Sequence, residues 1–398
     1  MTTNWVERSL LEVCDAYQPK TITMKDMVVD GPFLVYGANG VIGRYDKFNH
    51  EEAEVVLGCR GTCGAVNVSQ PKSWITGNAM VVRPKGKDID RQFLKYYLEG
   101  ASRFAGIITG VAQPQITRKS LAPLKINYPA LPEQQRIVGI LDEAFAGLAT
   151  ATANAEKNLK NAYELFDSVS KSLLQARNDW QRLSLETLLE RGWIVSHLDG
   201  NHGNDYPRKE EFISSGVPYL SANCLRNDSV DMSLAKFLSP QRAALLRKGV
   251  AQNGDVLFAH NATVGPVAML YTDEPKVILS TSLTYYRCHP GHIVPEYLAH
   301  YMRSPEFKGQ YEAVMRQSTR NQVPITKQRE FFHIIPPLEE QRTIAEKLDL
   351  LQGEVKRLDA TYLQRLTYLS DLKQALLQKA FSGDLTSPPP QTIREAAE

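Results

Sequence analysis

Two stretches of this chain, LPEQQRIVGILD at residues 131–142 and LEEQRTIAEKLD at residues 338–349, follow one pattern about 207 positions apart. Each combines a leucine, an acidic residue and Gln-Arg with an apolar pattern that ends in Leu-Asp. Because a chain built from repeats folds as repeated structural units, this pair of stretches decides the fold class.

Further matches keep the same order along the chain. The paired segments are Trp5 with Ser9-Leu10 and Trp180 with Ser184-Leu185; VLGCRGTCG (56–64) and VLFAHNATVG (256–265); Arg83 with 93–97 and Arg287 with 297–301; QPQIT (113–117) and QVPIT (322–326). The offset grows from about 175 to about 207, so the second copy gains loops. The chain therefore contains a globular block and a distinct segment, and then both again.

The segment after each block has the sequence of a long helix with a coiled-coil seam. Seam positions alternate in spacing between three and four, from Val138 to Leu173 with only Thr152 polar, and from Ile344 through Leu372 to Leu376 with only Arg365 polar. Such a repeat buries a narrow stripe that a lone helix leaves in water, so the natural partner of each helix is the other. The alternative, two unrelated surface helices, would need a wider apolar face.

The expected fold class is α/β, of the α+β kind, with a pseudo-twofold internal repeat. Proline residues mark the helix starts, and Gly383 followed by three prolines marks the second end. The predicted segments are globular domains at 1–130 and 180–335, helices at 131–179 and 336–385, and a flexible tail at 386–398.

Composition is that of an ordinary soluble protein, with 43% hydrophobic and 23% charged residues. The N-terminus lacks a signal sequence and no apolar stretch approaches the ~20 residues that span a bilayer, so a cytoplasmic protein is expected. The five cysteines include no CxxC pair and no disulfide framework. Cys59 and Cys63 are half of a possible metal site, but no nearby pair supplies the other ligands, so no metal is expected.

The stretch FLVYGANGVIGR at residues 33–44 has the glycine spacing of a dinucleotide-binding turn. That site needs a helix after the last glycine, and residues 44–58 have no apolar stripe at helical spacing. Asn39-Gly40 between two apolar runs instead predicts a β-hairpin, with Arg44 and Lys47 on or near its return strand. An oxidoreductase using Gly37–Gly43 remains the alternative. The motifs of nucleotide-triphosphate and zinc-protease sites are absent from the sequence, so no catalytic residue is expected.

As a set, these features resemble the specificity subunit of a type I restriction-modification system. The resemblance rests on VYGANGVIG, GCRGTCG, the Gln-x-x-Ile-Thr runs, the two helix openings and the C-terminal LLQKAFSGDL. It covers nearly the whole chain. One departure is that LPEQQR has one more residue than LEEQR, so the two helix starts need not be superimposable.

The resemblance implies a non-catalytic chain that binds double-stranded DNA. Each globular block would be a target recognition domain that reads one half of a bipartite sequence. The two helices would pair antiparallel, set the spacing, and dock two modification (methyltransferase) subunits and, through them, a restriction (nuclease/translocase) subunit. S-adenosylmethionine, ATP and Mg would belong to those partners, with no cofactor in this chain.

Base reading by such blocks falls to Arg, Asn, Gln, Thr and Ser in loops, and phosphate binding to Lys and Arg. Basic residues exceed acidic ones in both blocks, as expected if the blocks face DNA. The DNA-binding candidates are Asn39, Arg44, Lys47, Arg60, Thr62, Lys72, Asn78, Gln113, Arg118, Asn223, His260, Asn261, Thr263, Ser282, Arg316, Arg320, Asn321, Gln322 and Lys327.

On the helices, the partner-binding candidates are Gln135, Arg136, Gln341 and Arg342. The alternative is a plain polar first turn, in which Glu133 and Glu339 favour the helix dipole. A coiled-coil scaffold whose globular ends bind protein is a further alternative for the whole chain.

Overall fold

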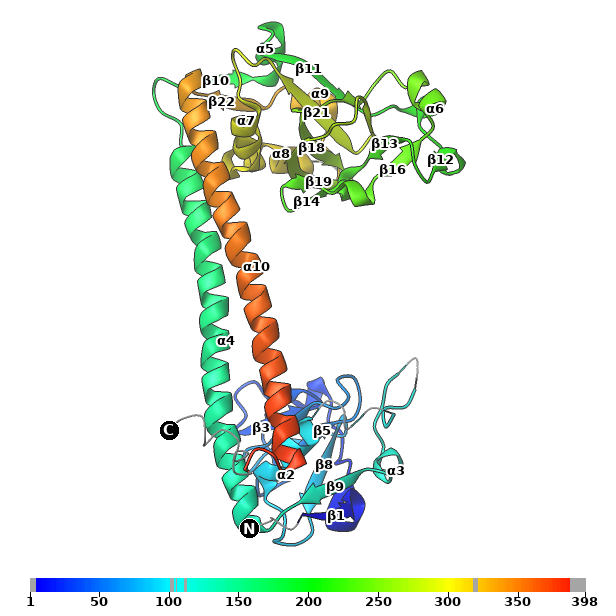
Figure 1. Cartoon of the computed structure of the whole chain (residues 1–398), viewed down its shortest axis with the longest axis vertical. Helices are drawn as coiled ribbons and strands as arrows, with labels where there is room; N and C mark the ends of the chain where they lie inside the picture. The colour runs from blue at the N-terminus through cyan, green and yellow to red at the C-terminus, as the bar shows by residue number, and fades with distance from the viewer. Residues whose placement is uncertain (1–4, 101–103, 105, 111–112, 318–320, 387–398) are drawn as a thin grey trace, which may run out of the picture. The chain divides into compact units, whose positions relative to one another are not determined.

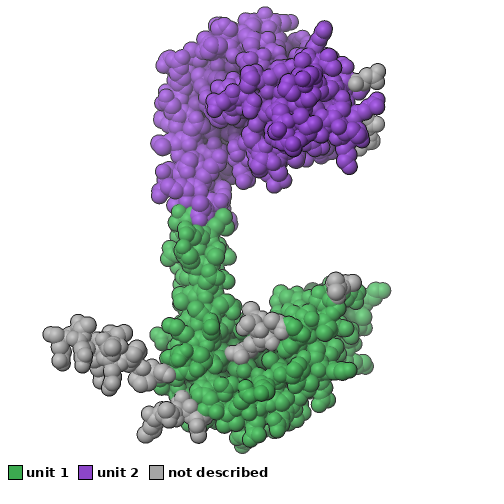
Figure 2. All heavy atoms as spheres, turned by 45° about the vertical axis from the view of Figure 1, so that its right-hand side comes forward, with its two compact units in different colours: residues 1–158, 361–398 green, residues 159–360 purple. Residues whose placement is uncertain are grey.

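The computed structural model describes residues 5–100, 104, 106–110, 113–317 and 321–386. The chain divides into two compact units: unit 1 is residues 1–158 with 361–398, and unit 2 is residues 159–360 (Figure 2). The predicted tail at 386–398 lies outside the described residues except for Thr386.

In unit 1, one sheet has the strand order β2-β8-β5-β6, a second has the order β4-β3-β7, and β1 pairs with β9 (Figure 1). The elements are β1 (Val6–Ser9), α1 (Leu10–Val13), β2 (Cys14–Tyr17), η1 (Met24–Asp26), β3 (Phe33–Gly37), β4 (Gly40–Tyr45), β5 (Val55–Gly58), β6 (Val66–Val68), β7 (Trp74–Ile75), β8 (Ala79–Pro84), α2 (Arg91–Glu99), α3 (Arg118–Leu121) and β9 (Lys125–Tyr128). Helix α2 follows an Asp90 cap and buries Phe93 and Leu94 against the first sheet.

Unit 2 repeats this plan with additions. Its sheets have the orders β11-β21-β18-β19 and β12-β16-β13-β20-β17, and β10 pairs with β22. The elements are β10 (Gln181–Ser184), α5 (Leu185–Glu190), β11 (Ile194–Asp199), η3 (Gly203–Asp205), η4 (Lys209–Glu211), β12 (Phe212–Ile213), β13 (Val217–Leu220), η5 (Ala222–Cys224), β14 (Leu225–Arg226), β15 (Ser229–Val230), η6 (Met232–Leu234), β16 (Lys236–Leu238), α6 (Pro240–Leu245), β17 (Val250–Ala251), β18 (Val256–Asn261), β19 (Thr263–Met269), β20 (Val277–Leu279), β21 (Leu283–Cys288), α7 (Pro295–Arg303), α8 (Pro305–Arg316), α9 (Ile325–Gln328) and β22 (Phe332–Ile335).

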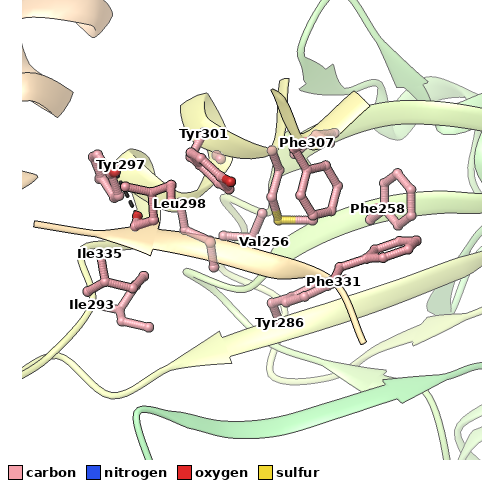
Figure 3. Close-up of a cluster of buried hydrophobic side chains, with 14 of the residues drawn as sticks. Val256, Phe258, Tyr286, Ile293, Tyr297, Leu298, Tyr301, Phe307, Phe331 and Ile335 are labelled. Carbon is pink, nitrogen blue, oxygen red and sulfur yellow. Dashed lines mark hydrogen bonds between the residues drawn. The ribbon is translucent and has the colours of Figure 1, made fainter. Parts of the chain in front are cut away.

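The core of unit 2 is built from aromatic and aliphatic side chains of its main sheet and the helices that cover it. Figure 3 shows Phe258 and Tyr286 from the sheet together with Tyr297, Tyr301 and Phe307 from α7 and α8. The ring of Phe307 lies edge-on to that of Phe258, with centroids 5.8 Å apart. Such large buried rings supply most of the apolar area that stabilises a unit of this size.

The registers of the two units establish which residues are equivalent. In unit 1, Val35 and Tyr36 pair in parallel with β7, as Tyr219 and Leu220 pair with β20 in unit 2. Val55 faces Val82 on the neighbouring strand, as Val256 faces Tyr286. The predicted match of residues 56–64 with 256–265 is therefore wrong by one position, because Val55 corresponds to Val256. A one-residue slip sends every strand side chain to the other face, so this alignment matters for the site.

The helices α4 (Leu131–Leu173) and α10 (Leu338–Ser382) begin at equivalent leucines. The inferred extra residue in LPEQQR is wrong, because buried Gln134 and Gln341 each donate to a carbonyl just before their helix, at Pro129 and Pro336. α4 ends at Leu173, six residues before the predicted boundary at 179.

Within each unit the two helices pair antiparallel, as predicted. In unit 1, Ile137 and Leu141 near the start of α4 share a core cluster with Leu377 near the end of α10. In unit 2, Leu174 just beyond α4 shares a cluster with Leu348 near the start of α10. The coiled-coil seam predicted for α10 is not buried at Leu372, whose side chain is 49% exposed. There the buried face of α10 has turned toward the globular part of unit 1, where Phe381 packs edge-on to Phe93.

The stretch FLVYGANGVIGR forms the predicted hairpin, β3 with β4. Its turn is Ala38-Asn39 rather than Asn39-Gly40, and Gly40 opens β4 with a φ of 99°, a conformation that favours glycine. A Cβ added at Gly43 would lie 2.6 Å from the sulfur of Met27, so this glycine allows a close approach. Residues 40–45 are a strand where a dinucleotide site requires a helix, so the nucleotide-binding alternative is wrong.

Candidate nucleic-acid interface

At the carboxyl end of β5 in unit 1, several segments that are distant in sequence meet. The backbone N–H groups of Cys59 and Arg60 both donate to the carbonyl of Asn78, at 3.1 and 3.2 Å. The N–H of Ile116 donates to the Cys59 carbonyl at 2.9 Å, and Arg60 forms a β-bridge with Gln115. Three chain segments are thus held together by main-chain bonds, which fixes the positions of their side chains.

The hairpin turn and the glycine loop join the same place through Gly58. A Cβ added there would lie 2.3 Å from the carbonyl oxygens of both Ala38 and Thr62, so the segments pack directly on the bare glycine backbone. Gln113 lies in the turn between Thr109 and Gln115. We name the exposed side chains gathered here the strand-end surface of unit 1: Asn39, Arg60, Thr62, Asn78, Gln113 and Gln115.

Unit 2 builds the same arrangement at the end of β18. The N–H of His260 donates to the Ser282 carbonyl at 3.0 Å, and the N–H of Val323 donates to the His260 carbonyl at 2.8 Å. Asn261 bridges Gln322, as Arg60 bridges Gln115. The strand-end surface of unit 2 comprises Asn223, Asn261, Ser282, Asn321 and Gln322, all exposed or half-buried.

Hydrogen bonds hold the polar side chains of this second surface in place. The amide of Asn321 donates to the Ala262 carbonyl at 2.6 Å, and Ala262 has a φ of 64°. The hydroxyl of Ser282 accepts from the Ala222 N–H at 2.9 Å, next to Asn223. Polar groups with restrained positions bind a partner at a smaller cost than mobile ones, because less conformational entropy is lost on binding.

Matching backbone bonds make the two surfaces equivalent position by position. The Thr76 N–H donates to the Tyr36 carbonyl as the Ser280 N–H donates to the Leu220 carbonyl. The resulting pairs are Asn39 and Asn223, Arg60 and Asn261, Asn78 and Ser282, and Gln115 and Gln322. The backbone is repeated while two of the four side-chain pairs differ in chemistry.

Other predicted DNA-binding residues lie elsewhere in their units. Arg44 on β4 donates to the carbonyls of Gly31 and Pro32, at 2.5 and 3.3 Å, and the exposed Lys47 follows that strand. Lys72 lies 3.6 Å from Glu51, and Arg118 is the first residue of α3.

In unit 2, Thr263 is exposed and faces Asn261 across the β18–β19 hairpin, so it adjoins the strand-end surface as Thr62 does in unit 1. Arg316 ends α8, away from that hairpin in sequence. Lys327 pairs with Glu330 at 2.8 Å. Arg320 lies outside the described residues.

His260 is in the interior, beneath the strand-end surface of unit 2. It is 2% exposed, its Nδ1 is 2.9 Å from the Val323 carbonyl, and burial lowers its pKa. The neutral ring therefore donates from Nδ1 to that carbonyl and holds β18 to the chain around Val323. It supports the surface rather than forming part of it.

Gln115 belongs to the strand-end surface of unit 1 and was missed. The sequence match paired Gln113 with Gln322, because both open a Gln-x-x-Ile-Thr run. The structure pairs Gln115 with Gln322, at the same offset of 207 that relates the two helix starts. The sequence signal that could have identified Gln115 is this offset of 207, which stays constant from these glutamines to the starts of the two helices.

Among the predicted partner-binding residues, Gln135, Arg136 and Arg342 are exposed, but Gln341 is buried. The Gln341 amide donates to the carbonyls of Pro336 and His292, and its oxygen accepts from the Val294 N–H. Gln134 makes the same bonds in unit 1. These two glutamines tie each helix start to its own unit.

No cluster of three His, Cys, Asp or Glu side chains able to hold a metal ion occurs among the described residues. Within the same residues, no helix is both long enough and apolar enough to cross a membrane.

Comparison with known proteins places both repeats in one family. The family model for the type I restriction modification DNA specificity domain matches residues 2–161 and 195–368. The EcoBI specificity subunit of Escherichia coli, from a type I restriction enzyme, is 19% identical over 398 residues, which cover 95% of this chain and 80% of that protein. The EcoKI specificity subunit of Escherichia coli (strain K12) is 24% identical over 325 residues, covering 77% and 68%.

Solved structures share the fold. A chain from a type I R-M system studied for its complex assembly and conformational transition superposes with a TM-score of 0.71 at 18% identity, covering 96% of this chain and 98% of that one. The HsdS subunit from Thermoanaerobacter tengcongensis gives a TM-score of 0.53 at 19% identity, covering 96% and 97%. With both of its repeats matched by the family model, the chain belongs to the type I restriction-modification DNA specificity family.

Proposed function

We propose that the chain recognises a bipartite DNA target, with residues 1–130 reading one half and residues 180–335 the other. The observation that carries this proposal is the duplicated strand-end surface, in which equivalent backbone positions bear Arg60 and Asn78 in unit 1 but Asn261 and Ser282 in unit 2. Arginine pairs with guanine edges and asparagine with adenine edges in the major groove. Two surfaces of one design and different side chains suit two different half-sites.

The helix pair is proposed to set the gap between the half-sites. α4 has 43 residues and α10 has 45, without interruption. At 1.5 Å per residue each helix is about 65 Å long, which exceeds one turn of DNA at about 34–36 Å. A continuous pair of helices is stiff, so the target should have a fixed gap.

The partners proposed for the chain are two modification subunits and, through them, a restriction subunit. Gln135, Arg136 and Arg342 are exposed at the helix starts and remain the proposed contacts. S-adenosylmethionine, ATP and Mg would be bound by those subunits, while this chain contributes recognition without catalysis, in the cytoplasm.

The test is DNA selection by the chain assembled with its modification partner. Random-sequence DNA should yield an enriched motif in two parts with a constant gap, and binding should weaken as salt rises. Failure to enrich any split motif would overturn the proposal. Capture of unrelated protein partners together with that failure would favour the scaffold alternative.

Single substitutions should then separate the two halves. Arg60→Ala should relax base preference at one position of one half, and Asn261→Ala should do so in the other half, each by roughly 1–3 kcal/mol of discrimination. Arg8→Ala is the matched control, because Arg8 is an exposed arginine on β1. Loss of preference in both halves from either substitution would contradict the assignment of one half to each unit.

A further inference from the structure

Beside the polar strand-end surface of unit 1, two adjacent aliphatic side chains are exposed. Val41 and Ile42 follow the Ala38-Asn39 turn in β4 and are 52% and 47% exposed. In a regular strand, neighbouring side chains point to opposite faces. Here the register pairs Tyr36 with Val41 and Val35 with Gly43, so Ile42 is the extra residue of a β-bulge, which re-aims side chains.

Ile42 is held in place despite its exposure. A Cβ added at Gly37 would lie 3.0 Å from Cγ2 and 3.1 Å from Cδ1 of Ile42, so the isoleucine lies over the bare backbone of the opposite strand. The absence of a side chain at Gly37 thereby makes room for Ile42 to pack on the hairpin. A side chain restrained in this way loses little conformational freedom when a partner covers it.

The apolar pair adjoins the polar surface directly. Asn39 precedes it by two residues, and the Ala38 carbonyl packs on Gly58 at the end of β5, two residues before Arg60. A Cβ added at Gly40 would lie 3.7 Å from the side-chain oxygen of Asn67 on β6. A ligand lying on the polar side chains would therefore meet Val41 and Ile42 at its margin.

Unit 2 shows that the fold does not require this exposure. The offset that pairs Asn39 with Asn223 pairs Val41 with Leu225, which is 6% exposed, and Ile42 with Arg226, which is exposed but charged. Leu225 faces Val230 in the short β14–β15 hairpin. The same point of the repeat holds an exposed apolar pair in unit 1 but a buried leucine and a charged side chain in unit 2, which favours a specific role for the exposed apolar pair.

We infer that Val41 and Ile42 contact the C5 methyl groups of thymines in the half-site read by unit 1. This inference rests on the proposed function. Among the base edges in the major groove, the thymine methyl is the apolar feature, and aliphatic side chains recognise it by direct contact. Polar and apolar readers would then act together on unit 1, whereas unit 2 reads with polar groups at the matching positions.

The test replaces each thymine of the selected target in turn by deoxyuridine, which removes only the methyl group. The Arg60→Ala variant identifies the half-site of unit 1. For the assembled complex, one or two replacements in that half should weaken binding about fourfold each, the effect of exposing one methyl-sized group. Replacements in the other half should leave binding unchanged.

A protein variant provides the second arm. The double substitution Val41→Ser with Ile42→Ser removes the methyl groups of both side chains and should abolish the difference between thymine and deoxyuridine. Val195→Ser is the matched control, because Val195 is 50% exposed on β11 of unit 2, and it should retain the difference. The deoxyuridine series on the unaltered chain stands even if the double variant fails to fold.

The outcomes separate this inference from the proposed function. A split motif whose unit 1 half contains no thymine, or none sensitive to deoxyuridine, would overturn the methyl contact while leaving bipartite recognition intact. A folded double variant that keeps the full difference would overturn it as well. Failure to select any split motif would overturn both.

Discussion

Unit 1 and unit 2 share a backbone plan but have chemically different interiors. Where unit 1 buries Ala16, Leu121 and Ile126, the equivalent positions of unit 2 hold His197, Gln328 and His333. All of these side chains are buried, and His197 is the most exposed of them at 3%. The strand registers and loop bonds are kept, so the fold tolerates either interior.

The polar interior of unit 2 is organised around one amide. The side-chain oxygen of Gln328 lies 3.0 Å from the Thr284 hydroxyl, 3.1 Å from the Tyr286 hydroxyl and 3.1 Å from Nε2 of His197. The comparison teaches that a repeated fold accepts buried polar groups when they bond one another, since an unpaired buried group is costly. It also means that the two units respond differently to substitution and to pH.

The largest difference should come from the ion pair between an arginine and a buried carboxylate that both units share. Arg287 donates from Nε and Nη2 to separate oxygens of Asp255, at 2.9 and 2.8 Å, whereas Arg83 contacts a single oxygen of Glu54. Arg287→Met should destabilise unit 2 by about 3–5 kcal/mol, because it leaves a buried carboxylate without its partner.

Arg83→Met should cost unit 1 less, because the Arg83 side chain is 44% exposed against 24% for Arg287. Hydrogen exchange resolved by peptide would measure each unit separately within the full chain. Equal losses in the two units would show that neither the second carboxylate contact nor the deeper burial of Arg287 adds to stability.

Exchanging the core residues tests whether the polar network is essential to unit 2. Gln328→Leu, which copies Leu121 of unit 1, leaves the Tyr286 hydroxyl and Nε2 of His197 without their acceptor, whereas the Thr284 hydroxyl keeps the Phe258 carbonyl at 3.4 Å. This substitution should destabilise unit 2 by about 3 kcal/mol. The reciprocal Leu121→Gln should destabilise unit 1 by a similar amount, by burying an amide among apolar groups. If Gln328→Leu proved neutral by hydrogen exchange, the network would be dispensable.

Mild acid should weaken unit 2 more than unit 1. Burial lowers the pKa of His197 to about 4 and that of His333 to about 3, against about 6.5 for an unfolded histidine. Folded unit 2 keeps both rings neutral, so their stabilising contribution is present above pH 6.5 and is lost as the pH falls toward those values. Between pH 7 and pH 6 the loss should be about 1.5 kcal/mol for the two rings together.

Unit 1 also contains a buried histidine with a lowered pKa, His50, so a smaller loss is expected there. Hydrogen exchange at the two pH values, corrected for the intrinsic rate, measures the difference. The double variant His197→Ala with His333→Ile restores the side chains of unit 1 and, if folded, should lose most of the extra sensitivity, while His260 and His300, whose pKa values burial also lowers, keep the rest. An equal response of both units in the unaltered chain would contradict this prediction.

The smallest effect on stability should come from the hydrogen bond that joins α2 to α4 in unit 1 and α7 to α10 in unit 2. In unit 1 the Tyr96 hydroxyl donates to Asp142, and in unit 2 Nε2 of His300 lies 2.8 Å from Asp349. Tyr96→Phe removes one hydrogen bond and should cost about 1 kcal/mol. His300→Phe should cost no more, because Asp349 is 52% exposed and water replaces the lost partner. A loss of several kcal/mol at either site, measured by thermal unfolding, would mean that the contact has a larger role.

Sequence reasoning found the strand-end surfaces only in part. Asn39, Arg60, Asn78, Asn261, Ser282 and Gln322 were named from loop position and residue type, and the structure gathers them. Sequence reasoning could not foresee that His260 points inward, because a histidine at the end of a strand fits either a surface or a core. It also could not choose Gln115 over Gln113, since both belong to one short polar run.

The sequence by itself determined the duplication, the pairing of the two long helices and the hairpin at residues 33–45, because periodicity and turn residues are local signals. Only the tertiary structure decided which loop residues share a surface and which polar residues are buried. Those outcomes depend on bonds between segments far apart in the chain, such as Cys59 with Ile116 and Gln328 with His197. A local sequence pattern does not predict such long-range bonds.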